Sequence, residues 1–363
     1  MSSYYVGDPI PRFAVRSTNN PNFNFDTTAG RFLVLSFFGS GFAARPLLDA
    51  VHGPLRHYFD DVKISFFGVS VDTADEKRIQ QSIPGLRYFW DFDQQVSQQF
   101  SAIDKEGSYQ PFTLVLDPNQ RVLARITMDE RHNATLASVL RGLPSLDDHA
   151  GVPAHAPILI IPRIFEPGFC RDLISIYERE GGTPTGVMRE IDGATVGVRN
   201  DSFKRRKDFA FETEPAYEDL RKQIGLRFRR RLVPEIQKAF QFSVSHIERY
   251  LVACYEAENK GFFRHHRDNT TKGTAHRRFA CTLNLNAEDF DGGDLRFPEY
   301  GTRTYRAPTG GAVIFSCSML HEATPVTRGN RYAFLPFLYD ADAAAIRREN
   351  RQYVSSEVID QNN

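Results

Sequence analysis

The first 130 residues alternate short apolar runs with a stretch of helical periodicity. Residues 30–38 and 62–70 are apolar runs bounded by turn residues, which is typical of buried strands. Between them, apolar residues recur at helical spacing, at Leu47, Leu48, Val51 and Leu55. A helix is predicted to begin near Asp75, and residues 111–119 and 122–126 predict two strands joined by a turn. Strands that alternate with helices and end in a hairpin predict an α/β sandwich.

The pattern breaks at residues 142–157, which are rich in proline, glycine and small residues and have no apolar periodicity. A chain of 363 residues is long enough for two domains that each bury a core. The predicted organisation is therefore a first domain at 1–141, a linker at 142–157, a second domain at 158–345 and a C-terminal tail at 346–363.

The second domain opens with an apolar strand at 158–165 and an amphipathic helix at 166–177. A second amphipathic helix is predicted from about 215 to 240, with its core positions at Leu220, Ile224, Leu226, Phe228 and Ile236. From Ser245 onward the chain predicts strands. The expected architecture is a β-rich domain with helices packed on one side.

Composition excludes several classes of protein. The chain has 45 basic and 45 acidic residues, so no net charge attracts nucleic acid or an anionic membrane. No apolar run is long enough to span a bilayer, and the first five residues lack the features of a signal peptide. The four cysteines, Cys170, Cys254, Cys281 and Cys317, lack the paired spacing of a structural zinc site or a disulfide framework. These features predict a cytoplasmic protein.

Candidate metal ligands lie in the second half of the chain. His266 and Asp268 are separated by one residue, so on a strand both side chains point to the same side and His265 points away. A second histidine, His321, follows far downstream. Two histidines and one carboxylate are the ligand set of non-haem Fe(II) oxygenases, because this set leaves positions open for a co-substrate and O2. Ten residues later, Arg331 begins an apolar run and offers a guanidinium to a carboxylate.

Several motifs in order extend this pattern: Val252-Ala-Cys-Tyr255, the segment 290–297, and His321-Glu-Ala-Thr-Pro-Val. Together they resemble the prolyl 4-hydroxylase-like 2-oxoglutarate/Fe(II) dioxygenases over roughly the second half of the chain. The resemblance implies a double-stranded β-helix, which is a jelly-roll fold. It also implies Fe(II), 2-oxoglutarate and O2 as the requirements for catalysis, and ascorbate is a candidate additional cofactor.

The resemblance also implies roles for individual residues. His266, Asp268 and His321 are expected to be the catalytic iron ligands, and Arg331 is expected to hold the distal carboxylate of 2-oxoglutarate. Tyr255 and Asn284 occupy positions where relatives place co-substrate contacts, although Asn284 stands where some relatives have a tyrosine. Residues 186–200 and the basic run 204–207 correspond to a flap over the substrate. That basic run could meet an acidic substrate, but a solvated loop face is favoured.

The first domain resembles a different family. Its opening segment, Val6-Gly-Asp-Pro-Ile-Pro-Arg-Phe13, and Pro111-x-Thr113 before a strand are similar to the peroxiredoxin and redoxin family, which implies a thioredoxin-like α/β sandwich. Pro111 is a candidate for the cis-proline of that fold. Relatives carry a peroxidatic cysteine in the turn after the first core strand. Here residues 38–46 contain no cysteine, and none precedes Cys170. Thiol peroxidase and disulfide exchange both need a thiolate, so this domain cannot perform them with its own residues.

The function predicted from these features is 2-oxoglutarate- and Fe(II)-dependent hydroxylation of an unactivated C–H bond, with 2-oxoglutarate decarboxylated to succinate. The substrate could be a residue such as proline in a peptide or protein, or a small metabolite. The alternative is a non-catalytic sensor or assembly protein that binds iron and 2-oxoglutarate, and a thiol peroxidase is less favoured. The first domain could be a dimerisation surface, a substrate-recognition module or a scaffold. A scaffold with a homodimer contact is favoured.

Overall fold

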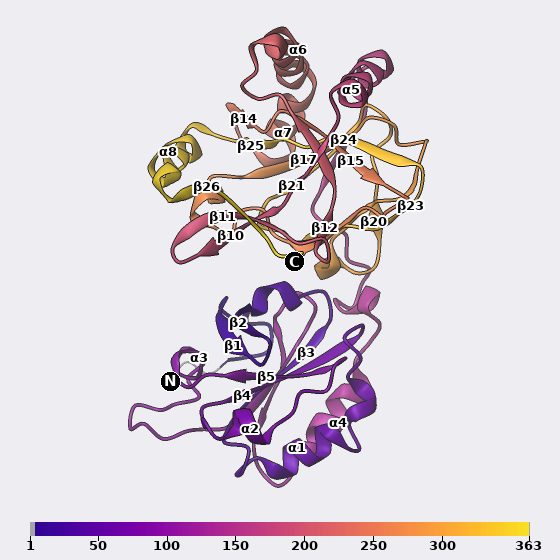
Figure 1. Ribbon diagram of the computed structural model, residues 1–363. Helices are drawn as coiled ribbons and strands as arrows, with labels where there is room; N and C mark the ends of the chain where they lie inside the picture. Colours follow the sequence, from indigo (N-terminus) through magenta and orange to yellow (C-terminus); the bar gives the residue numbers. More distant parts are fainter. Residues whose placement is uncertain (1–3, 363) are drawn as a thin grey trace. The chain divides into compact units, whose positions relative to one another are not determined.

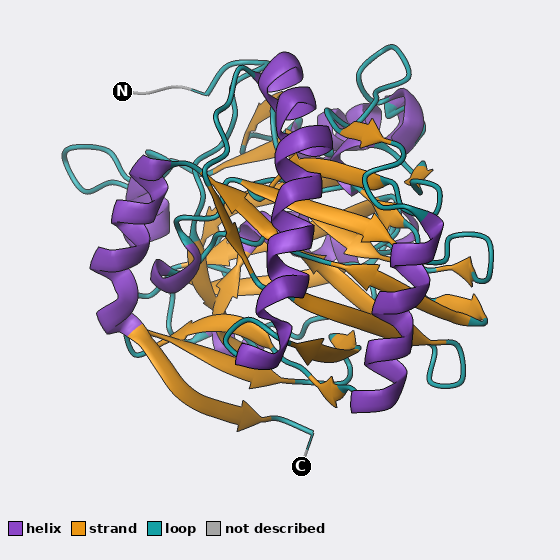
Figure 2. Cartoon of the chain, turned by 90° about the horizontal axis from the view of Figure 1, so that it is seen from above, coloured by secondary structure: helices purple, strands orange, loops and turns teal. Residues whose placement is uncertain are grey.

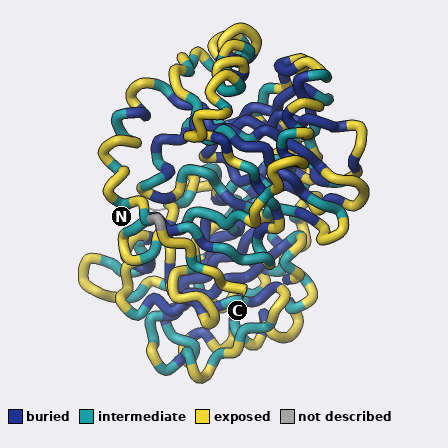
Figure 3. Tube along the Cα trace, turned by 45° about the horizontal axis from the view of Figure 1, so that its top comes forward, coloured by how far each residue is buried: buried dark blue, intermediate teal, exposed yellow. Residues whose placement is uncertain are grey.

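The computed structural model describes residues 4–362, and the chain forms two compact units. One unit comprises the residues up to 156 together with 298–302, and the other comprises 157–297 and 303–363. In each unit the strands are largely buried and most connecting loops are more exposed (Figure 3). None of the helices in the described residues has the length and apolar character needed to cross a bilayer.

The first unit is built on a seven-stranded sheet in the order β2-β1-β5-β4-β3-β6-β7 (Figure 1). Strands β3, β4 and β5 are parallel, whereas β6 and β7 pair antiparallel at one side. This arrangement is the predicted thioredoxin-like sandwich. The strands are β1 (Ala14–Ser17), β2 (Asn20–Asn24), β3 (Phe32–Gly39), β4 (Ile64–Ser70), β5 (Leu86–Trp90), β6 (Phe112–Leu116) and β7 (Val122–Thr127).

Both faces of this sheet are covered, which explains why β3 is apolar at almost every position. Phe32 and Val34 pack with residues of the helices α1 and α4, which lie side by side on one face (Figure 1). Leu33 and Leu35 point the other way, into a second apolar cluster. The helical segments are η1 (Phe25–Thr28), α1 (Arg45–His52), η2 (Arg56–Tyr58), α2 (Asp75–Arg78), α3 (Gln95–Gln99), α4 (His132–Gly142) and η3 (Leu146–Asp148).

The turn after β3, where the family resemblance would place a thiol, is held by polar contacts. Ser40 Oγ donates to Asp72 Oδ2 at 3.0 Å, and the backbone N–H of Gly41 donates to Asp75 Oδ2 at 2.6 Å. The cis peptide bond in the described residues joins Ile83 to Pro84. The prediction of a cis bond at Pro111 is therefore wrong.

The second unit is a jelly roll in which two main sheets face each other. The larger sheet has the order β14-β25-β17-β24-β15-β13-β9, with β21 paired to β17 and β8 paired to β21. Its strands are β8 (Leu159–Ile161), β9 (Thr183–Pro184), β13 (Lys207–Ala210), β14 (His246–Glu248), β15 (Leu251–Glu256), β17 (Phe279–Asn284), β21 (Ala312–Ser316), β24 (Asn330–Phe334) and β25 (Phe337–Tyr339).

The smaller sheet has the order β12-β16-β22-β19-β20. A hairpin of β10 and β11 is extended by the C-terminal strand β26, and β18 pairs with β23. The remaining strands are β10 (Val187–Ile191), β11 (Ala194–Arg199), β12 (Lys204–Arg205), β16 (Phe262–His266), β18 (Asp291–Gly292), β19 (Leu295–Arg296), β20 (Thr304–Tyr305), β22 (His321–Ala323), β23 (Val326–Arg328) and β26 (Val354–Asp360).

Helices cover the outer face of the larger sheet, as predicted (Figure 2). Along β15, Val252 and Cys254 point into the core shared with these helices, whereas Ala253 and Tyr255 point to the opposite face. The helical segments are α5 (Pro167–Glu180), η4 (Pro215–Tyr217), α6 (Glu218–Arg227), the π-helix η5 (Phe228–Leu232), α7 (Val233–Phe240), η6 (Lys272–Thr274), η7 (Pro298–Tyr300), which groups with the first unit, α8 (Ala341–Asn350) and η8 (Arg351–Tyr353).

Two predictions for this unit are corrected. Leu226 is 47% exposed, because it lies midway between the buried Ile224 and Phe228 and so points away from the face that they share. Residues 346–363, predicted as a tail, contain the end of α8 and the strand β26, which pairs in parallel with β11. Backbone pairing to β11 therefore brings this segment into the second unit.

Candidate active site

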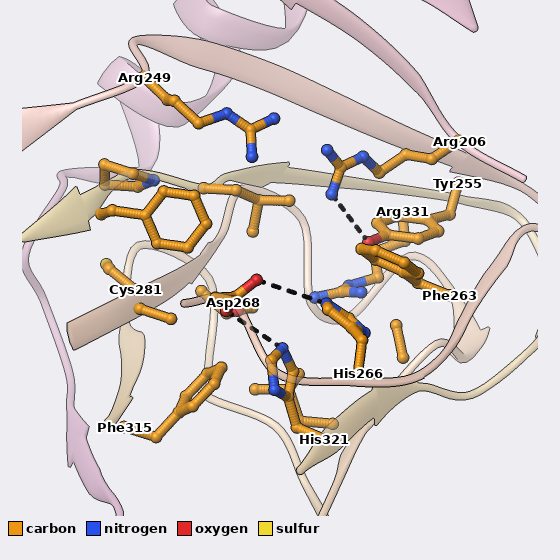
Figure 4. A pocket seen from close by; sticks show the side chains of 17 residues that line it. Arg206, Arg249, Tyr255, Phe263, His266, Asp268, Cys281, Phe315, His321 and Arg331 are labelled. Atoms are coloured by element: carbon orange, nitrogen blue, oxygen red, sulfur yellow. Dashed lines mark hydrogen bonds and ion pairs between the residues drawn. The ribbon is translucent and has the colours of Figure 1, made fainter. Parts of the chain in front are cut away.

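Three potential metal ligands converge where β16 meets β22. The two strands pair antiparallel with His266 opposite His321, and Asp268 follows two residues after the end of β16. One ligand atom from each residue lies within 4.8 Å of the others. Asp268 lies between the histidines, with Oδ1 3.5 Å from His266 Nε2 and Oδ2 3.4 Å from His321 Nε2 (Figure 4). This two-histidine, one-carboxylate set fits Fe(II).

Backbone carbonyls fix both imidazoles in the state that a metal requires. His266 Nδ1 lies 2.7 Å from the carbonyl oxygen of Arg264, and His321 Nδ1 lies 3.1 Å from that of Met319. A carbonyl only accepts hydrogen bonds, so each Nδ1 carries a hydrogen, and Nε2 is the nitrogen that offers a lone pair when the ring is neutral. The Nε2 atoms are the ones that face Asp268, so the rings are oriented for metal binding by contacts outside the ligand set.

The electrostatics of the site also favour metal binding. Burial alone would raise the pKa of Asp268, but His321, His266 and Arg277 hold it well below its usual range. Burial, followed by the charge of His266, lowers the pKa of His321 to about 4. At neutral pH the carboxylate is therefore ionised and His321 is neutral, which are the protonation states of metal ligands.

His265 lies on the other side of β16. Its Nε2 is 2.9 Å from Glu322 Oε2 and 3.2 Å from Arg296 Nη2. The alternation of side chains along the strand therefore separates two consecutive histidines, one at the candidate metal site and one beside Glu322 and Arg296.

A small cavity of about 60 Å³ adjoins the three ligands. Arg331 and Tyr255, which sit opposite each other on β24 and β15, both line it. The Arg331 guanidinium lies over the Tyr255 ring at 4.9 Å from its centroid. Arg331 is 2% exposed, and its Nη1 is buried without a hydrogen-bond partner among the described residues. A buried, unpaired guanidinium nitrogen is costly, so this site fits an anion such as the distal carboxylate of 2-oxoglutarate.

Asn284 does not line this cavity. Its Nδ2 donates instead to the carbonyl of Ala307 at 2.8 Å, beyond the part of β17 that reaches the cavity. The structure therefore does not bring Asn284 to the site with Tyr255 and Arg331.

A buried arginine beside Tyr255 was not predicted from the sequence. Arg206 lines the cavity, and its Nη1 donates to the Tyr255 hydroxyl at 3.3 Å (Figure 4). Lys204 and Arg206 are only 5% and 8% exposed, so the expectation of a solvated basic loop is wrong for both. Alternation along this extended segment turns Lys204 and Arg206 inward and leaves Arg205 exposed. Four consecutive basic residues show no hydropathy contrast, so only a strand assignment could have revealed this alternation.

Comparison with known proteins agrees with this geometry. Residues 250–339 match the model of the 2OG-Fe(II) oxygenase superfamily. The second unit contains a 2OG-Fe(II) oxygenase domain. A PKHD-type hydroxylase of Synechococcus sp. (strain JA-2-3B'a(2-13)) is 37% identical over 93 residues, which is 24% of this chain and 41% of the relative. A PKHD-type hydroxylase of Paracoccus denitrificans is 47% identical over 47 residues, 13% of this chain and 21% of the relative. The chain thus matches less than half the length of these curated relatives.

Two solved structures each align with part of the chain. A prolyl hydroxylase from Trichoplax adhaerens, in complex with a hypoxia inducible factor peptide fragment, covers 60% of this chain and 97% of its own, with 14% identity and a TM-score of 0.43. Mycobacterium tuberculosis AhpC covers 40% of this chain and 93% of its own, with 20% identity and a TM-score of 0.33.

Proposed function

We propose that this protein is a 2-oxoglutarate- and Fe(II)-dependent dioxygenase that hydroxylates an unactivated C–H bond. The observation that carries the proposal is a single cavity bordered by three metal ligands and by the unpaired Nη1 of Arg331. A metal site alone would fit many functions. The added arginine supplies what a co-substrate with a second carboxylate needs.

When bound, Fe(II) and 2-oxoglutarate supply O2 activation, with decarboxylation of 2-oxoglutarate to succinate and CO2. His266, Asp268 and His321 would hold the metal, and Arg331 would hold the distal carboxylate. The Tyr255 hydroxyl accepts a hydrogen bond from Arg206, so its own hydrogen is available to donate to that carboxylate. The apolar side chains of Phe315 and Leu295 line the cavity and reduce the access of water.

A second candidate function is a sensor that binds iron and 2-oxoglutarate without turnover, and the same contacts support it. Thiol peroxidase is not supported. All four cysteines are buried in the second unit, and burial raises the pKa of Cys170 and Cys254 to about 12. A thiolate is the reactive species, so these thiols are poor nucleophiles at neutral pH. The unpaired cysteines suit a reducing compartment, and we place the protein in the cytoplasm.

The deciding experiment measures succinate formation from 2-oxoglutarate with Fe(II), ascorbate and O2. We expect turnover by the wild type and its loss in His266→Ala and Arg331→Ala. Arg328→Ala is the matched control, because Arg328 is 61% exposed and pairs with Asp291 on the surface. Fe(II)-dependent binding of 2-oxoglutarate without turnover would favour the sensor. Absence of both binding and turnover in the wild type would rule out both functions.

The role of the first unit stays a prediction. A homodimer contact through this unit is expected from the sequence, and light scattering of the purified full-length chain measures the oligomeric state. A monomer at all concentrations would exclude that role.

A further inference from the structure

A second, larger cavity of about 340 Å³ also reaches two of the metal ligands, His266 and Asp268. His266, Asp268, Phe263 and Arg249 line both cavities, so the two meet at the candidate metal site. The β10–β11 hairpin and β26 contribute further lining residues, Val187, Met188, Gly197 and Val358. The volume is at the lower end of the range of roughly 300–1,000 Å³ that holds small-molecule ligands.

The charges around this cavity do not balance. Its lining residues include four cations, and Asp268 is the one carboxylate among its described lining residues. Arg277 is paired elsewhere, because its Nη2 lies 2.8 Å from Glu248 Oε1. Asp268 is assigned to the metal. Arg267, also half-buried, donates from Nη1 to the carbonyl oxygen of Ser318. The other two cations, Lys204 and Arg249, have no ion pair shorter than 3.5 Å among the described residues.

Lys204 has no carboxylate partner within the described part of the chain. Its Nζ donates to Thr185 Oγ1 at 2.7 Å and to the carbonyl of Gly186 at 2.8 Å, and both acceptors are neutral. An ammonium group carries three hydrogens, so one remains for a ligand. Burial, together with the charges of Arg206 and Arg249, lowers the pKa of Lys204. An arriving anion would relieve this unfavourable environment.

Arg249 lines the cavity and has an unusual backbone conformation. Its φ is 70°, in the left-handed region that L-residues seldom occupy, at the turn between β14 and β15. Its one ion pair in the described structure is a long contact of 3.5 Å from Nη2 to Asp208 Oδ2. Asp208 is already engaged by Arg206, with Nε 2.6 Å from Oδ1 and Nη2 2.7 Å from Oδ2. The carboxylate of Asp208 is therefore shared between Arg206 and Arg249.

We propose that the larger cavity is the substrate site and that Lys204 and Arg249 bind a carboxylate of a small anionic substrate. The inference rests on the proposed function and adds the class of substrate to it. The two carboxylates of 2-oxoglutarate would be used by the metal and by Arg331, so the carboxylate at Lys204 and Arg249 must come from another molecule. A guanidinium and an ammonium group that point into one cavity discriminate an anion from its neutral analogue.

The test uses the full-length protein with Mn(II), in two steps. First, 2-oxoglutarate binding is measured by the shift in thermal unfolding, which needs no turnover. Second, with 2-oxoglutarate saturating, the standard L-amino acids and their N-acetyl derivatives are compared with the matched C-terminal amides. Each pair differs by one negative charge. The binders are then assayed with Fe(II) for stimulation of succinate formation.

We expect one or more of the carboxylates to bind and stimulate, and their amides to fail. Arg249→Gln and Lys204→Met should each weaken the carboxylate binding about 10- to 100-fold while 2-oxoglutarate still binds, which also shows that the variants fold. Arg249→Lys, which keeps the charge, should recover part of the affinity. Arg205→Gln, the exposed neighbour in the same basic run, should change it less than about twofold.

Four results would overturn the inference. Amides could bind as well as carboxylates, or no probe could bind to a protein that binds 2-oxoglutarate. Alternatively, Arg249→Gln could weaken 2-oxoglutarate and leave the probe unaffected, which would assign Arg249 to the co-substrate. Failure of the first step, with no metal-dependent binding of 2-oxoglutarate by the wild type, would overturn the proposed function and the inference with it.

Discussion

Two groups of buried polar side chains, one in each unit, differ in whether their hydrogen bonds end inside the protein or at a cavity. In the first unit, Ser36 on β3 hydrogen bonds to Thr113 on β6, and Thr113 bonds to His132 on α4, each at 2.8 Å. All three side chains are buried, and the chain of hydrogen bonds ends within the unit. In the second unit, the Nε2 atoms of His266 and His321 and the Nη1 of Arg331 face a cavity.

This difference shows where chemistry can occur. A buried polar group that is satisfied internally stabilises a fold, whereas one left unsatisfied costs free energy unless a ligand meets it. The first unit has the sheet order of a thioredoxin-like domain but contains no cysteine. The second unit places three potential metal ligands and the unpaired Nη1 of Arg331 around one cavity. Fold alone does not distinguish the two units, whereas the cavity shared by the metal ligands and Arg331 points to chemistry in the second.

The strongest test of this contrast removes Asp268, the carboxylate ligand of the candidate metal site. Asp268→Ala should abolish succinate formation and weaken Fe(II) binding by at least about 100-fold, because even contacts outside the ligand set are worth 10- to 100-fold in metal affinity. The matched control is Asp72→Ala in the first unit, where the carboxylate accepts a hydrogen bond from Ser40. Calorimetric titration with Fe(II) under anaerobic conditions measures the effect. Equal binding by Asp268→Ala would show that the metal lies elsewhere.

Core substitutions should affect the two units separately. Leu35 and Leu283 are both fully buried, one in the sheet of each unit. Leu35→Ala and Leu283→Ala should each cost about 2–5 kcal/mol of the free energy of unfolding. Denaturant unfolding measures the loss of stability of each variant, and a separate titration measures its affinity for 2-oxoglutarate. Leu35→Ala should leave binding by the folded protein unchanged, and a matching loss of binding affinity would mean that the first unit shapes the site.

Much of this contrast could be predicted from the sequence. The apolar runs at 30–38 and 62–70 correspond to β3 and β4, because sheets covered on both faces need apolar residues at every position. Because side chains alternate along a strand, the sequence predicted that His265 and His266 would lie on opposite sides of it. The absence of a cysteine before Cys170 excluded thiol chemistry in the first unit without any structural information.

The rest depended on contacts between distant segments. Lys204 and Arg206 were expected in solvent because charged residues are seldom buried unless they are paired. Arg206 pairs with Asp208, which lies on the next strand, β13. Whether two residues this close in sequence form an ion pair depends on the local backbone conformation. The strand β26 is recognisable only through its pairing with β11. Asn284 lies on β17, the strand that also carries residues lining the cavity beside the metal ligands. Only the structure shows that this cavity does not reach Asn284.

The smallest expected effect concerns the buried hydrogen-bonded side chains Ser36, Thr113 and His132 of the first unit. Burial lowers the pKa of His132 from the ordinary value of 6.5. As the pH falls below that value, the unfolded chain binds a proton that the folded unit does not bind. The unfolded state is then favoured, so the first unit should lose stability as the pH falls below about 6.5. A folded pKa above the ordinary value would give the opposite trend.

His132→Gln tests this role, because glutamine can still hydrogen bond to Thr113 but cannot be protonated. We expect the variant to lose the fall in thermal stability between neutral pH and about pH 5 that this histidine causes, while succinate formation at neutral pH stays unchanged. His246→Gln, at an exposed histidine of the second unit, is the control for a general effect of removing a histidine. A loss of succinate formation in His132→Gln alone would mean that the buried chain Ser36–Thr113–His132 supports catalysis. The buried hydrogen bonds of the first unit would then contribute to the chemistry of the second unit as well as to the stability of the fold.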